Sequence, residues 1–250
     1  MRKLTLILFT LVIPFTLLGN SVEQLFTKAN DAYANKKYAD AINIYEQVID
    51  SGYVSAELYY NLGSAYYKTD NISFAILNLE RADKLSDDED IDHNLAIARL
   101  KTIDKVTPVE QIFIVEWLDA IRSNLNSAGW SYWTIIFIWV VFAFFAMLIF
   151  SRSTSVKKIS FIGIVTSLML FSVTFYFAYS TNEREYVKQY AILTSPSAYV
   201  KSSPDDKSQD LFILHEGVKM EVLDRVGDWN KIRLDNGEIG WIDKSSFRPI

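Results

Sequence analysis

Residues 130–179 read WSYWTIIFIWVVFAFFAMLIF, SRSTSVKK and ISFIGIVTSLMLFSVTFYFAY in succession, two apolar runs around a short basic segment. Each run has 21 residues and contains no Asp, Glu, Lys, Arg or His. A helix needs about 20 apolar residues to cross the hydrocarbon core of a bilayer, and aromatic residues near both outer ends suit the membrane interface. A buried hairpin of a soluble protein rarely carries two such runs back to back. We therefore predict transmembrane helices over residues 130–150 and 159–179.

The segment between the runs, residues 151–158, predicts how they are oriented. It contains Arg152, Lys157 and Lys158 and no acidic residue. Short loops rich in lysine and arginine stay in the cytoplasm. We therefore expect this basic loop to be cytoplasmic, which places both large flanking regions on the opposite side of the membrane.

The beginning of the chain supports the same orientation. Arg2 and Lys3 precede an apolar run from Leu4 to Leu18, the layout of a secretory signal peptide over residues 1–19. An uncleaved membrane anchor is the alternative. Both hypotheses export the residues that follow.

Only Ser, Thr and one Gly interrupt the apolar character of these runs, whereas transport pathways need charged or broken helices at membrane depth. These helices therefore resemble anchors. Before them, residues 108–128 predict an amphipathic juxtamembrane helix, because apolar residues recur at helical spacing. The stripe comprises Ile114, Trp117, Leu118, Ile121 and Leu125. It suits a helix on the outer membrane surface, one docked on a partner, or one packed against the preceding domain.

Residues 56–82, AELYYNLGSAYYKTDNISFAILNLERA, resemble a tetratricopeptide repeat. Gly63 and Ala75 would let two antiparallel helices approach closely, while larger apolar residues fill the space around them. Residues 26–49 form an earlier copy with a shorter turn, and residues 91–101 repeat the first helix again. We predict an α-helical tetratricopeptide repeat domain over residues 22–105.

The resemblance implies a concave groove that binds an extended peptide or protein segment. Tyr60, Asn61 and Tyr67 should then be largely solvent-facing, and the asparagines could hydrogen-bond a peptide backbone. Asn61 has an alternative role in stabilising the repeat itself. The full candidate groove comprises Tyr60, Asn61, Ser64, Tyr67, Lys68 and Asn94.

Residues 188–250 alternate between apolar and polar positions and contain turn signals at Glu216-Gly217, Val226-Gly227-Asp228 and Asp235-Asn236-Gly237. This region resembles a bacterial SH3-like domain, a small all-β barrel. Its candidate ligand surface is formed by Tyr199, Trp229 and Trp241. The alternative is that the two tryptophans are core or rim residues of the barrel.

Several classes of function lack a signature in the sequence. Cysteine is absent, and His93 and His215 have no partner at metal-ligand spacing. Neither exported region is basic, with 15 acids to 9 bases over residues 21–105 and 12 to 10 over residues 183–250. We therefore predict neither catalysis, nor a cofactor or metal, nor nucleic-acid binding.

The whole order is a signal peptide, tetratricopeptide repeats, a two-helix transmembrane hairpin and an SH3-like barrel. This multidomain membrane architecture, with the HNLAIAR helix before the hairpin, resembles the BatE family of the bacterial aerotolerance (Bat) operons. The resemblance implies an inner-membrane scaffold with both large domains periplasmic. It further implies von Willebrand A-type Bat proteins and a MoxR-type ATPase as partners, in oxidative or envelope stress. The alternatives are a peptidoglycan receptor that uses the SH3-like domain, and an accessory subunit of a transporter or sensor complex.

Overall fold

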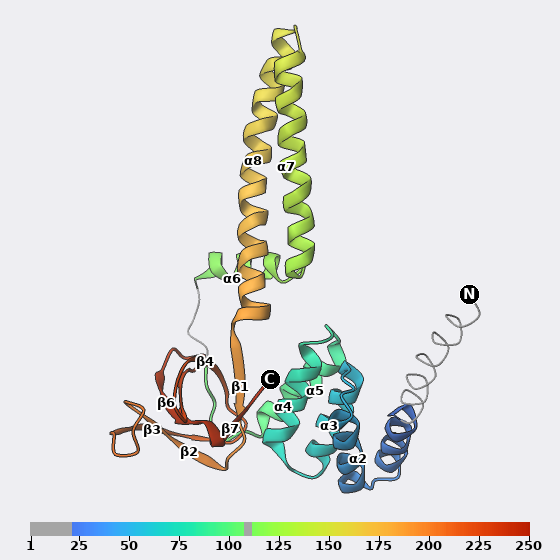
Figure 1. Ribbon diagram of the computed structural model, residues 1–250, viewed down its shortest axis with the longest axis vertical. Coiled ribbons are helices and arrows are strands. Elements are labelled where there is room, and N and C mark those ends of the chain that lie inside the picture. Colours follow the sequence, from blue (N-terminus) through green and yellow to red (C-terminus); the bar gives the residue numbers. More distant parts are fainter. Residues whose placement is uncertain (1–21, 108–111) are drawn as a thin grey trace, which may run out of the picture. The chain divides into compact units, whose positions relative to one another are not determined.

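The computed structural model describes residues 22–107 and 112–250. The predicted signal peptide therefore lies outside the described residues. The chain divides into two compact units, one combining Met1–Pro108 with Tyr190–Ile250 and the other comprising Val109–Gln189. The first unit thus contains both the predicted repeat region and the predicted β domain, although the apolar helices separate them in the sequence (Figure 1).

The helical part of the first unit starts with a helix over residues 22–34. Four more helices follow: α2 (Tyr38–Asp50), α3 (Ala56–Lys68), α4 (Ile72–Asp83) and α5 (Glu89–Leu100). Side-chain caps help to set the helix starts, because the Ser55 hydroxyl accepts the Leu58 N–H at 3.1 Å and Asp88 accepts the Asp90 N–H at 2.9 Å. The acidic segment 86–92 is helical from Glu89 onward.

Helices α3 and α4 approach each other closely at Gly63. A Cβ atom there would lie 2.9 Å from the Leu79 side chain and 3.1 Å from the carbonyl oxygen of Ala75. No side chain fits in that space, so the close approach of two helices predicted at Gly63 is present in the structure. Two apolar clusters fill the rest of the helical part. One is built around Ala29, Tyr45, Leu58, Leu62 and Tyr66, and the other around Ile76, Leu77, Leu79, Leu95 and Ala98.

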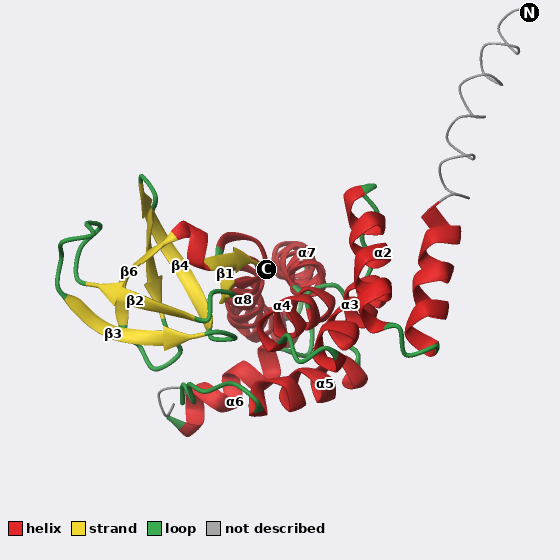
Figure 2. Ribbon diagram, turned by 90° about the horizontal axis from the view of Figure 1, so that it is seen from below, coloured by secondary structure: helices red, strands yellow, loops and turns green. Residues whose placement is uncertain are grey.

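The β part of the first unit is an antiparallel arrangement of short strands (Figure 2). The strands are β1 (Gln189–Leu193), β2 (Ser197–Lys201), β3 (Asp210–His215), β4 (Lys219–Val226), β5 (Trp229–Arg233), β6 (Ile239–Asp243) and β7 (Phe247–Pro249). Their order in the sheet is β3-β2-β6-β5-β4-β1-β7. The inward-facing positions form one apolar core that includes Val200, Met220, Ile232 and Ile242. Gly240 lets β6 approach β2, because a Cβ there would lie 2.3 Å from the Val200 side chain.

A polar interface joins the β3–β4 turn to α4 and to the segment after α5. The Ser73 hydroxyl donates to Glu216 at 2.7 Å. Asp104 accepts the His215 backbone N–H at 2.6 Å and lies 3.0 Å from its Nδ1. Gly217 has φ +87°, and a Cβ there would strike the Thr102 side chain at 2.7 Å. The turn is therefore shaped both by its backbone conformation and by contact with the helical part.

A buried carboxylate lies at the centre of this interface. The Glu80 side chain is 2% exposed and forms ion pairs with Arg99 of α5 and Lys219 of β4. Nearby, burial and the carboxylates of Asp92 and Glu80 raise the pKa of Asp83 to about 6, while Lys219 acts in the opposite direction. The helical and β parts thus share charged contacts as well as apolar ones, and Ile250 packs on the α4–α5 cluster.

The second unit contains α6 (Phe113–Arg122), α7 (Ser127–Phe150), α8 (Thr154–Asn182) and a π-helical turn (Glu183–Val187). Helices α7 and α8 are long and apolar enough to cross a membrane. Helix α7 begins three residues before its predicted span and ends with it at Phe150, whereas α8 extends beyond its predicted span at both ends. Only residues 151–153 connect them, so Lys157 and Lys158, expected in a loop, lie in the first turns of α8. Neither Gly nor Pro occurs between residues 154 and 158 to prevent the helix from starting there.

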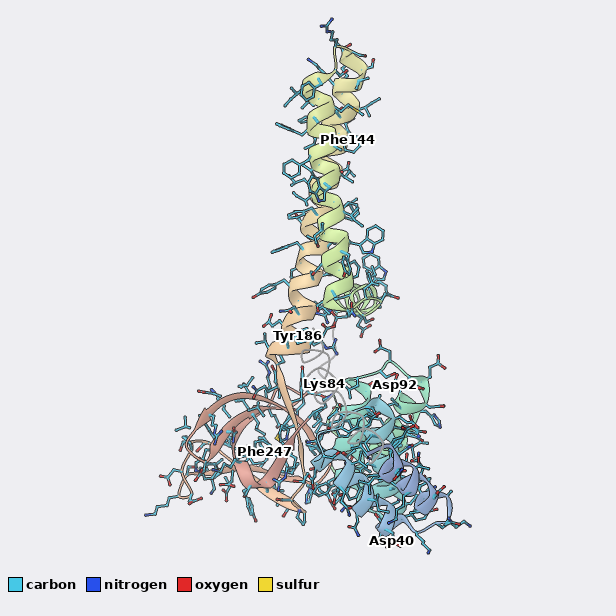
Figure 3. All side chains as sticks on the ribbon, turned by 45° about the vertical axis from the view of Figure 1, so that its right-hand side comes forward. Asp40, Lys84, Asp92, Phe144, Tyr186 and Phe247 are labelled. Carbon is cyan, nitrogen blue, oxygen red and sulfur yellow. The ribbon has the colours of Figure 1, made fainter. Side chains whose placement is uncertain are left out.

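The α7–α8 contact pairs large side chains with small ones. The buried hydroxyl residues of α8 recur every seven residues, at Ser160, Ser167, Thr174 and Thr181. A Cβ on Gly163 would lie 2.8 Å from the ring of Phe144, which is labelled in Figure 3. Small residues on one helix therefore receive aromatic side chains from the other, a packing that allows close approach in lipid as well as in water.

Candidate functional site

The six predicted groove residues lie together around one cavity of about 470 Å³. Five come from α3 and one, Asn94, comes from α5. They have this common position because α3 presents residues three or four apart on one face, and α5 packs beside it. The complete lining is Tyr33, Tyr60, Asn61, Ser64, Tyr67, Lys68, Leu79, Asn94 and Ile97.

Side-chain hydrogen bonds connect the walls of this cavity. Asn94 donates its amide N–H to the Tyr60 hydroxyl at 2.6 Å. Asn61 donates to the side-chain oxygen of Asn30 at 3.2 Å, and the buried Tyr45 hydroxyl donates to the same oxygen at 2.6 Å. Each groove asparagine therefore bonds a neighbouring helix. The bond from Asn61 to Asn30 supports the alternative role of Asn61, which is to stabilise the repeat itself.

The expectation that Tyr60, Asn61 and Tyr67 are largely solvent-facing is wrong. All three are half-buried. The spacing places them on the inner face of α3, but side chains from the flanking helices reach over them. Lys101, for example, places its ammonium 4.5 Å from the centre of the Tyr67 ring while binding Asp70 at 2.8 Å. Replacing these residues would therefore remove contacts within the fold as well as contacts to a ligand.

The cavity has a mixed polar and apolar lining, in which Lys68 is the charged residue. Burial is the largest cause that raises the pKa of Tyr33, and the nearby Tyr38 and Tyr60 add to it. The Tyr33 phenol therefore remains neutral at physiological pH and can both donate and accept a hydrogen bond. Lys68 is exposed at the rim. Phenols, amides and a hydroxyl beside apolar Leu79 and Ile97 can hydrogen-bond a peptide backbone and contact its apolar side chains.

Asn30 and Lys101 contribute to this region although the sequence analysis did not select them. Asn30 lies three residues before Tyr33, as Gly63 lies three residues before Tyr66. An asparagine at a position where a small residue is expected was the available signal that this amide points into the helix contact. Lys101 reaches Tyr67 only because α5 packs beside α3, which no local pattern indicates.

The three candidate residues of the β part lie on the outward face of the sheet. Strand alternation places Val200, Asn230 and Ile242 inside, so their sequence neighbours Tyr199, Trp229 and Trp241 face outward. Tyr199 is 59% exposed, whereas both tryptophans are half-buried. The tryptophans are thus rim residues that still contribute to the surface.

Strand register places two lysines among these aromatic residues. Trp241 of β6 lies opposite Lys201 of β2 on one side and opposite Lys231 of β5 on the other. Tyr199 pairs with Ile213 of β3, which is 41% exposed. Because paired residues share a face, Lys201, Trp241 and Lys231 form one cross-strand line over β2, β6 and β5. Tyr199 and Trp229 lie on the same outward face, and these five side chains are called the aromatic row. This row could contact a sugar or peptide, although Lys201 already pairs with Asp210 at 2.8 Å.

Over residues 22–107 and 112–250, no three His, Asp or Glu side chains converge as metal ligands. His93 is exposed on α5, and His215 contacts Asp104 in the interface between the helical and β parts. The structure therefore gives His215 a contact within the fold.

Comparison with known families identifies the β part. Residues 196–247 match the bacterial SH3 domain family. The matched segment begins one residue before β2 and ends at the first residue of β7. No curated protein matches the chain.

Proposed function

We propose that this chain is a membrane-anchored scaffold that binds other proteins through the α3–α5 cavity, without catalytic activity of its own. The observation that carries the proposal is the convergence of Tyr60, Asn61, Ser64, Tyr67, Lys68 and Asn94 around one open cavity with peptide-binding chemistry. In this proposal the helices of the first unit are tetratricopeptide repeats. The close approach at Gly63 supports that assignment.

The proposed location follows from the second unit and the chain's charge pattern. Helices α7 and α8 would cross the bacterial inner membrane as a hairpin, with Arg152, Lys157 and Lys158 on the cytoplasmic side. Both ends of the hairpin then lead to the periplasm, where the helical and SH3-like parts would act. The resemblance to the BatE family makes von Willebrand A-type Bat proteins and a MoxR-type ATPase system the partners to look for.

A variant that fills the cavity tests this function. Ser64 lines the cavity and its side chain is small, so Ser64→Arg should block a ligand without removing the hydrogen bonds of Asn61 or Asn94. Gln47→Arg adds the same charge at an exposed position of α2 and serves as the control. Both variants and the natural chain are purified from detergent-solubilised membranes, and bound proteins are identified by mass spectrometry. The scaffold proposal requires a partner that is lost with Ser64→Arg and kept with Gln47→Arg.

A second function, binding of peptidoglycan, is supported by the aromatic row of the SH3-like part and its match to the bacterial SH3 domain family. Tyr199→Ala removes the most exposed of the three candidate side chains, at 59% exposure. Tyr53→Ala, in the loop between α2 and α3 at 45% exposure, is the matched control. The detergent-solubilised full chain should sediment with purified sacculi, and only Tyr199→Ala should weaken that binding. Equal binding by both variants would remove Tyr199 from the ligand surface.

A further inference from the structure

Helix α6 carries an apolar face that its own unit leaves uncovered. None of its ten residues, all of them described, is buried. Phe113, Ile114 and Trp117 are 76%, 62% and 56% exposed. At 100° per residue these side chains share one side of the helix with Leu118, while Glu116 lies on the other side. Such a concentration of exposed apolar residues is typical of a surface that contacts a protein or a membrane.

Two side chains fasten the carboxyl end of α6 to the hairpin. The indole N–H of Trp130 donates to the carbonyl oxygen of Arg122 at 2.9 Å. The Arg122 guanidinium donates to the Ser180 hydroxyl at 2.6 Å. The Trp130 ring also packs against Phe177, with ring centres 4.9 Å apart. Helix α6 is therefore tied to α7 and α8 at once, and it lies across the end of the hairpin (Figure 1).

That end of the hairpin has the residues of a membrane interface. Tyr132 and Trp133 of α7 are exposed there, as are Tyr176 and Tyr179 of α8. Exposed tyrosine and tryptophan at the end of a long apolar helix mark the headgroup level of a bilayer. With α7 and α8 in a membrane, α6 is held at that level.

We propose that α6 is an interfacial helix whose apolar face inserts between the headgroups and acyl chains of the membrane that α7 and α8 cross. The proposal rests on the membrane anchor of the proposed function. The continuous apolar surface of the hairpin favours lipid as the occupant over a protein partner. Insertion of this kind is driven by buried apolar area, with an electrostatic contribution where basic residues line the polar face.

The charges of α6 define which lipid it needs. Its ionisable residues are Glu116, Asp119 and Arg122, and the last two form an ion pair at 3.0 Å. An acidic helix gains nothing from anionic headgroups. Zwitterionic phosphatidylcholine should therefore suffice, and added phosphatidylglycerol should not deepen the insertion.

The natural chain contains no cysteine, so single labels can be placed cleanly. Ile114→Cys lies on the apolar face and Glu116→Cys on the polar face, which makes them a matched pair. Phe142→Cys, 57% exposed in the middle of α7, reports on membrane insertion itself. Each full-length variant carries a fluorophore and is reconstituted in phosphatidylcholine nanodiscs, with or without phosphatidylglycerol. Quenching by nitroxide-labelled lipids is compared with quenching by iodide.

The Ile114 label should be quenched at least threefold more than the Glu116 label by a shallow nitroxide lipid, and iodide should show the reverse order. The values should not depend on phosphatidylglycerol. If the Phe142 label is quenched by a deep nitroxide but the Ile114 label is open to iodide, the hairpin is in the membrane and the interfacial helix is wrong. If the Ile114 label is shielded from both quenchers, a protein covers α6 and the proposal is also wrong. A Phe142 label that iodide reaches overturns the membrane anchor itself.

Discussion

Replacing Lys219 with alanine should loosen the contact between the helical and SH3-like parts of the first unit. Lys219 is one of two cations paired with Glu80, whose side chain is 2% exposed. Removing one partner of a fully buried ion pair costs about 3–5 kcal/mol, because the remaining charge is left without compensation. Here Arg99 remains, and the Lys219 side chain is 30% exposed. We therefore expect a loss of about 2 kcal/mol, the magnitude of one hydrogen bond to a charged group.

Hydrogen exchange of the full chain in detergent measures this loss locally. Amide protons of α4 and of the β3–β4 turn should exchange about 30-fold faster, since 1.4 kcal/mol corresponds to a factor of ten. Lys244→Ala is the control, because it breaks an ion pair with Asp228 in which both side chains are at least half exposed. Exposed pairs contribute about 0–1 kcal/mol. If Lys219→Ala and Lys244→Ala change exchange to the same small extent, the interface does not hold the two parts together.

Three further predictions concern titration, packing and topology. Because the pKa of Asp83 is raised to about 6, the folded state binds the proton of this carboxyl group more tightly than the unfolded chain does. The free energy of unfolding should therefore fall as the pH rises from about 4 to about 6. Asp83→Asn should abolish that fall and stabilise the protein at pH 7 by about 1–2 kcal/mol after screening at this half-buried site, as thermal unfolding across the pH range would show. Gly63→Leu should cost about 1–3 kcal/mol or more, because the α4 backbone as well as a side chain lies in the way, and an unchanged melting curve would contradict the packing. Cysteines at Ser86 and Ser208 should react with an impermeant maleimide in intact spheroplasts, whereas one at Ser153 should react only after lysis; early labelling of Ser153 would reverse the topology.

Features that depend on neighbouring residues could be predicted from the sequence. The two apolar helices follow from hydropathy alone, since their length and composition suffice. Gly63 was predicted at a close helix approach, and the structure leaves no room for a Cβ there. The candidate groove residues share one cavity because periodicity determines which side chains lie on one face of α3. The SH3-like part was identifiable because its turn glycines occupy specific backbone conformations, such as φ +86° at Gly237.

Contacts between distant segments could not be predicted in this way. Glu80 has the pattern of an ordinary charged helix residue, yet its side chain is 2% exposed. Its partner Lys219 lies 139 residues away in the sequence, so no local pattern indicates the pair. The sequence predicted Glu216-Gly217 only as a turn of the SH3-like domain. In the structure Glu216 also bonds Ser73, Gly217 lies against Thr102, and the preceding His215 bonds Asp104. In a single sequence, a turn that serves only the barrel and a turn that also docks on a helix have the same pattern of residues.

The position of this interface bears on the choice between the two proposed functions. It uses the β3–β4 turn, α4 and the segment after α5, whereas the cavity is lined mainly from α3 and α5. The aromatic row lies on the outward face of β2, β6 and β5. Docking therefore leaves both candidate surfaces open within one compact unit. Protein binding and peptidoglycan binding do not compete for the same residues. If both occur, Lys219→Ala should leave the affinity for each ligand unchanged. The distance between the two bound ligands should become variable, because the variant loosens the contact between the helical and SH3-like parts.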